Sequence, residues 1–154
     1  MPYCGGQFSF AKAAKAGSPL YRSYEIEAAQ PYSEADLAYY TGGRCDQEQD
    51  NPDIRPAIAN PLVDIGQYST IIIGHPIWHG QAPRIISTFL ESYDFSGRTM
   101  TTFCTSMSSG LGSSASNLYP LVSDTVTWLE SRRFPAGASK EEIAAWLNEI
   151  GVSK

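Results

Sequence analysis

Through most of the chain, segments with the apolar pattern of a strand are followed by segments with the apolar pattern of a helix. Residues 69–74 hold three consecutive isoleucines between turn-forming residues, which indicates a strand covered on both faces. Residues 99–105 and 125–130 predict two further strands. Residues 20–27 are less apolar and predict an edge strand.

Helix signals lie between these strands. Pro83 suits the first turn of a helix that ends near Ser92 and carries apolar residues on one face. Ser33 and Ser139 each begin a capping box ahead of apolar positions. Residues 113–122 predict a weaker helix, and residues 40–66 predict a long loop. From residue 69 onward this order predicts βαβ units and a parallel sheet.

Composition narrows the class of protein. The 154 residues suffice for a single domain over 1–154, and 42% of them are apolar. A net charge of −5 argues against nucleic-acid binding, and no apolar run approaches the roughly 20 residues of a membrane span. The start of the chain lacks the pattern of a signal peptide, so we expect a cytoplasmic protein. Cys4, Cys45 and Cys104 form no even framework, which predicts reduced thiols.

In a parallel sheet the ligand lies beyond the carboxyl ends of the strands. Residues 75–80 and 106–113 leave those ends. The first segment offers an aromatic side chain, and the second offers a Gly/Ser backbone rich in N–H donors. Together they suit a flat aromatic ligand with polar edges.

Other motifs in these segments give weaker alternatives. Residues 110–115 match the G-x-G-x-x-[GA] fingerprint, but too little chain follows to complete a dinucleotide fold; a dinucleotide-only reductase stays an alternative. His75 and His79 are four apart, yet Pro76 opposes a helix across them and no carboxylate joins them at ligand spacing. We therefore predict no metal site and assign no catalytic side chain.

Several ordered segments carry a family resemblance: residues 23–27, 31–37, 55–58, 74–78, 82–92, 93–99 and 105–113. The chain resembles the flavodoxin-like FMN-binding flavoproteins, in particular the bacterial branch with a Pro-Ile-Trp loop. The likeness covers about residues 20 to 150. It implies an α/β fold with a doubly wound parallel sheet in three α/β/α layers, and FMN held without a covalent bond.

The resemblance also implies which residues hold FMN. The expected cofactor-binding residues are Pro76, Ile77, Trp78, His79, Thr105, Ser106, Met107, Ser108, Ser109 and Gly110. Trp78 is expected to stack near the isoalloxazine ring, or to be exposed to solvent without it. Residues 105–110 are expected to direct N–H groups and hydroxyls at the polar edge of the ring. Met107 stands where relatives often have Gly.

The beginning of the chain departs from this family. Residues 11–16 look like the tail of the first helix, so residues 1–7, which lack Ser and Thr, fall where the phosphate-binding loop belongs. We therefore expect an N-terminally truncated or recoded fold without the first, central strand. The gap between residues 21–27 and 69–74 would be closed by joining the flanking strands or, as we favour, by strand exchange in a homodimer.

The resemblance implies an FMN-dependent electron-transfer or oxidoreductase protein in which the flavin carries the redox chemistry. Whether it is an electron carrier or a small FMN-dependent reductase stays open. The partner would be a redox protein or a small-molecule electron acceptor. The alternative is a flavin-free, flavodoxin-like remnant that acts only as a structural or dimerising module.

Overall fold

Two long parallel strands form the middle of the sheet in a computed structural model that describes residues 10–15, 21–61 and 64–152. β3 (Tyr68–Pro76) and β4 (Thr99–Thr105) pair from Thr70 and Thr99 to Pro76 and Thr105. Both strands lie where the apolar pattern predicts them. Of the strand predicted over 125–130, only β5 (Thr127–Trp128) forms, and β6 (Arg132–Phe134), which the pattern did not predict, follows it; each is parallel to β4.

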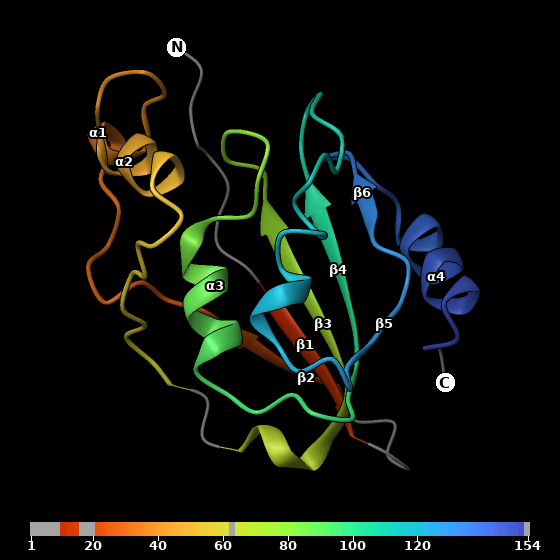
Figure 1. Cartoon of the computed structure of the whole chain (residues 1–154). Coiled ribbons are helices and arrows are strands. Elements are labelled where there is room, and N and C mark those ends of the chain that lie inside the picture. The colour runs from red at the N-terminus through yellow and green to blue at the C-terminus, as the bar shows by residue number, and fades with distance from the viewer. Residues whose placement is uncertain (1–9, 16–20, 62–63, 153–154) are drawn as a thin grey trace.

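The first strand closes the sheet within one chain. β1 (Phe10–Lys15) lies between β2 (Tyr21–Glu25) and β3, giving the order β2-β1-β3-β4-β5 (Figure 1). The helix tail predicted over 11–16 is therefore wrong for residues 11–15, while residue 16 and the segment 1–7, where the phosphate-binding loop was expected, lie outside the described residues. β1 runs antiparallel to both neighbours, with Ala11 opposite Tyr24 on one side and Ile73 on the other. Its N–H and C=O groups pair across the expected gap, so the sheet is mixed rather than wholly parallel.

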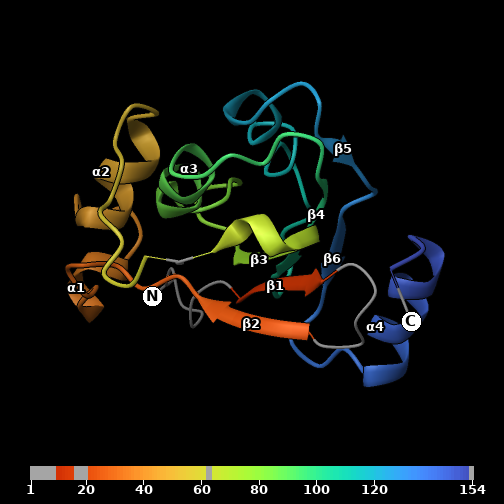
Figure 2. The same ribbon diagram turned by 90° about the horizontal axis from the view of Figure 1, so that it is seen from below.

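Helices cover both faces of the sheet (Figure 2). α3 (Arg84–Glu91) and the short η2 (Tyr119–Leu121) lie on one face, and α4 (Lys140–Glu149) lies on the other. This confirms the three-layer α/β/α class. The helix predicted over 113–122 is wrong, because that segment forms turns before η2.

The side chains of β3 alternate between two cores. Ile71 and Ile73 are at most 1% exposed and pack in one cluster with Phe89 of α3, while Ile72 packs in another with Trp146 of α4. Gly74 follows this run because a Cβ atom there would stand 2.4 Å from the Phe103 ring. Burying each large apolar side chain contributes about 1.5–3 kcal/mol, so this sandwich holds the sheet.

Local capping chemistry starts two helices as predicted. Ser33 caps α1 (Glu34–Leu37): its hydroxyl accepts from the Asp36 N–H, and its own N–H donates to the Asp36 carboxylate. Ser139 caps α4 in the same way with Glu142. Gly151 ends α4 with a φ of 74°.

Residues 40–66 are not wholly a loop, since they contain α2 (Arg44–Asp50) and the start of η1 (Ile65–Gln67). Cys45 of α2 is disulfide-bonded, which contradicts the prediction of reduced thiols, whereas Cys104 is a free thiol, as predicted, and is buried.

Candidate functional site

Two loops meet at the carboxyl edge of the sheet, at the top of Figure 1. Because β3 and β4 are parallel and end in register at Pro76 and Thr105, the segments after them leave the sheet side by side. Gly112 approaches Gly80 so closely that a Cβ atom on it would stand 3.2 Å from the Gly80 carbonyl oxygen. The structure therefore brings the two predicted ligand loops together.

The loop after β4 presents backbone donors to solvent. Arg133 of β6 donates from Nη2 to the carbonyls of Ser106 at 2.8 Å and Met107 at 2.9 Å, and the Ser106 hydroxyl donates to the Ser109 carbonyl. In the described chain the N–H groups of residues 107–110 have no partner, and all four residues are exposed. Carbonyl groups of this loop are held by hydrogen bonds, while its N–H groups stay available as donors. Such a loop suits the polar, electron-rich edge of a flat ring, which offers hydrogen-bond acceptors. Thr105, just before this loop, is exposed as well.

Trp78, in the loop after β3, does not lie on the surface. Its side chain is 0% exposed and packs beside Cys45 and against the edge of Tyr32, with ring centroids 5.3 Å apart. Its main chain exchanges bonds of 2.8 and 3.0 Å with Gln81, and its carbonyl also accepts a bond from Gln49. The prediction of an exposed indole is wrong, because the segment that carries α1 and α2 covers it. Of the other predicted residues here, Pro76 is buried and Ile77 is half-buried.

His79 is anchored to a carboxylate at the same loop. Its Nε2 lies 2.8 Å from Oδ1 of Asp46. The two oxygens of the Asp46 carboxylate also accept hydrogen bonds from the backbone N–H groups of residues 40–42. Burial opposes the charged carboxylate, but these hydrogen bonds outweigh it and lower the pKa of Asp46. Tyr40 and His79 both adopt positive φ, 59° and 48°. Such strained backbone persists only where the surrounding contacts enforce it, as they do here.

The exposed aromatic side chain beside this loop is Tyr40. It is 82% exposed, and its ring centroid lies 5.3 Å from that of His79. Tyr39 stands behind it, where its hydroxyl donates to the Ile77 carbonyl at 3.2 Å and burial raises its pKa. Neither tyrosine is among the site residues predicted from the sequence, although an adjacent aromatic pair in a polar segment was a visible signal.

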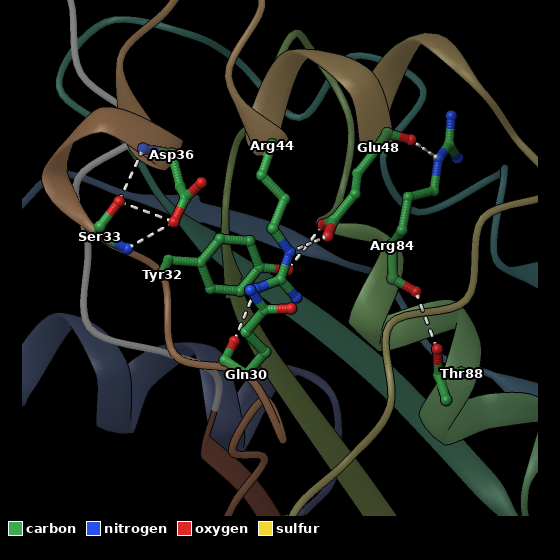
Figure 3. A network of polar contacts seen from close by, with 8 residues as sticks. All are labelled: Gln30, Tyr32, Ser33, Asp36, Arg44, Glu48, Arg84 and Thr88. Carbon is green, nitrogen blue, oxygen red and sulfur yellow. Dashed lines mark hydrogen bonds and ion pairs between the residues drawn. The ribbon is translucent and has the colours of Figure 1, made fainter.

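A polar network ties α2 to the segment that carries Tyr32 (Figure 3). Arg44 pairs with Glu48 at 2.6 Å and lies 3.9 Å from the centre of the Tyr32 ring, whose hydroxyl also donates to Glu48 at 2.6 Å. Burial, together with the bond to Glu48, raises the pKa of Tyr32 far above its ordinary value. The apolar pattern missed α2 because the buried face of this helix is largely polar: it consists of Cys45, Asp46, Glu48 and Gln49.

The two histidines of the β3 edge do not converge. His75 is 3% exposed, and its Nδ1–H donates to the Pro76 carbonyl at 2.9 Å. Burial lowers its pKa to about 4, so the ring is neutral at pH 7. Within the described ranges no cluster of three or more His, Cys, Asp or Glu side chains could hold a metal ion. Residues 110–115 form turns instead of opening a helix, unlike a dinucleotide-binding fingerprint.

A sheet with parallel central strands, helices on both faces and two loops that meet at one carboxyl edge defines a doubly wound α/β protein. The flavodoxin family profile matches residues 8–150, and the chain belongs to the flavodoxin family. No curated protein matches the chain.

Three solved structures are similar to the chain. A candidate flavoprotein from Bacteroides eggerthii is 38% identical, with 84% of this chain and 81% of that chain covered and a TM-score of 0.74. One from Bacteroides uniformis is 39% identical over 81% of this chain and 80% of that chain, also with a TM-score of 0.74. A Lactobacillus acidophilus flavoprotein in complex with FMN is 26% identical over 66% and 63% of the two chains, with a TM-score of 0.47. Among the described helices, none is long and apolar enough to cross a bilayer.

Proposed function

We propose that this flavodoxin-family chain binds FMN without a covalent bond between the loops that follow β3 and β4. FMN supplies a ring that accepts and donates electrons or hydride when it is bound. The chain would then act as an electron carrier or a small FMN-dependent oxidoreductase. Its partner would be a redox protein or a small-molecule electron acceptor.

The free N–H groups of residues 107–110 carry this proposal. They have no partner in the described chain, and they fit the polar edge of FMN, which gains negative charge on reduction. The guanidinium of Arg133 holds the carbonyls of Ser106 and Met107 away from that edge. It also places a positive charge behind the loop, which favours electron-rich ligands.

We further propose that Tyr40 supplies the aromatic contact expected of Trp78. Tyr40 is 82% exposed beside His79, whereas the indole is enclosed. Stacking an aromatic ring on the flavin contributes on the order of 1 kcal/mol beyond burial. His79, held by Asp46, would keep this side of the site in place.

The test is a titration of the purified protein with FMN, in which binding is measured as quenching of the flavin fluorescence. We expect saturable binding, and Arg133→Met should weaken it at least about tenfold because the loop loses its anchor. Arg132→Met is the matched control, since Arg132 is the neighbouring arginine of β6 and pairs with Glu149 on the surface. No binding at about 100 μM FMN would refute the proposal and favour a flavin-free structural or dimerising module.

The disulfide at Cys45 bears on the compartment. Disulfides persist where the surroundings are oxidising, so we propose that the protein works in such a compartment rather than in the cytoplasm predicted from its sequence. The predicted homodimer by strand exchange stays a prediction, but the central gap that motivated it is filled by β1.

A further inference from the structure

A pocket of about 450 Å³ opens on the α3 side of the molecule. It lies between the segment after α2, the first turn of α3 and the segment around η2, and its size falls in the range of small-molecule sites. Gln81, at the end of the β3 loop, lies on its wall, so the pocket borders the proposed flavin loops without including their donors. Apolar cover comes from Pro120 and Leu121.

Arg84 is the main polar group of this pocket. Arg84 is only 9% exposed. Its guanidinium donates from Nε to the Glu48 carbonyl at 3.0 Å and from Nη2 to the Gln49 carbonyl at 2.9 Å. Figure 3 shows the first of these bonds, with the guanidinium pointing away from the Arg44 network. Its third nitrogen, Nη1, has no partner in the described chain.

The charge of Arg84 is not balanced by a carboxylate. Both of its bonds go to neutral carbonyls, and no ion pair joins it to an acid in the described chain. A second cation, Arg55, also lines the pocket, and burial first, then the charge of Arg55, lower the pKa of Arg84. Arg55 has its own counter-ion, because it holds Glu91 through bonds of 2.6 and 2.8 Å. A buried guanidinium without a counter-charge is unfavourable, and an anion in the pocket would relieve it.

The other polar groups in the pocket indicate which anion fits. Ser87 is 6% exposed, and its hydroxyl makes no hydrogen bond in the described chain. The side-chain amides of Gln81 and Asn117 are joined at 3.3 Å, which leaves the other amide atoms of both free to bind a ligand. Asp53 stands on the exposed rim, and its carboxylate disfavours a dianion such as phosphate.

We propose that this pocket binds a small organic monocarboxylate, with its carboxylate on Arg84 and Ser87 and its apolar part against Pro120 and Leu121. The amides of Gln81 and Asn117 would orient the polar substituents of the ligand. The site rests on the uncompensated arginine and stands whether or not the neighbouring loops hold FMN. It gives a flavodoxin-family chain a second, ligand-specific site next to the loops.

The test uses benzoate as the probe and follows amide and arginine signals by NMR in the flavin-free protein. We expect saturable shifts at the Gln81 and Asn117 side-chain amides and at Nε of Arg84. Benzamide, the neutral analogue of the same shape, should cause none of them. Arg84→Met should weaken benzoate binding at least about tenfold, since a charge-assisted bond is lost. Arg132→Met, a surface arginine paired with Glu149, is the control and should leave binding unchanged.

Leu121→Trp provides a second variant, because the larger side chain fills the pocket and leaves the bonds of Arg84 to α2 intact. It should also abolish the benzoate shifts, so the proposal can be tested even where Arg84→Met fails to fold. Equal binding of benzamide, tighter binding of inorganic phosphate, or unchanged benzoate binding in folded Leu121→Trp protein would each overturn the proposal.

Discussion

His75 makes the stability of this protein depend on pH. Its ring is 3% exposed, its Nδ1–H donates to the Pro76 carbonyl, and its Nε2 has no partner in the described chain. Protonation would place a charge at that nitrogen with no acceptor to receive it. Burial accordingly lowers the pKa of His75 from 6.5 to about 4.

The sign follows from proton binding. Between pH 6.5 and about 4 the unfolded chain binds a proton on this histidine and the folded chain does not, so acid favours unfolding. The stability is complete above pH 6.5 and is lost as the pH falls toward 4. The separation of the two pKa values corresponds to roughly 3 kcal/mol in the free energy of unfolding.

Urea denaturation between pH 4 and 7.5, with His75→Phe as the comparison, measures this term. The buried carboxylates contribute equally to both proteins, and any change in packing is constant with pH. We therefore expect the difference between the two free energies of unfolding to change by about 3 kcal/mol over this range, with the wild type losing more. Parallel curves, or an NMR titration of His75 with a midpoint near 6.5, would refute the reasoning.

Three further predictions concern the site and the cysteines. Trp78→Ala should lower the free energy of unfolding by about 3–5 kcal/mol, because the indole is 0% exposed; a loss below about 1 kcal/mol in urea would contradict that packing. Cys45 and Cys104 are both 0% exposed, so in denaturant without reductant iodoacetamide should label Cys104 but not Cys45, which should react only after reduction. Mass spectrometry of peptides reads both sites, and labelling of unreduced Cys45 would exclude the disulfide. In the folded protein Cys104, whose pKa burial raises to about 11, should stay unlabelled. Met107→Gly should leave FMN affinity equal or higher, since that side chain is 92% exposed, and a clear loss in the fluorescence titration would count against the donor loop.

Local chemistry determined much of this fold. The isoleucine run of β3, the apolar face of α3 and the capping boxes at Ser33 and Ser139 all lie where the sequence predicts them. Each depends on residues within one or two turns or on one strand, so the pattern along the chain contains the information. The same pattern located both loops proposed to bind FMN, because parallel strands end at one edge of the sheet.

Tertiary contacts decided the rest. Residues 11–14 read Ala-Lys-Ala-Ala, which has a high intrinsic helix propensity, but tertiary context overrides propensity: the otherwise unpaired backbone of β2 and β3 draws this segment into the sheet as β1. α2 buries polar side chains, which no hydrophobic period reveals, because Asp46, Glu48 and Gln49 find their partners on segments distant in the sequence. That helix in turn covers Trp78 and leaves Tyr40 exposed. A sequence specifies which side chains are present at a loop, but which of them faces the ligand depends on what packs behind it.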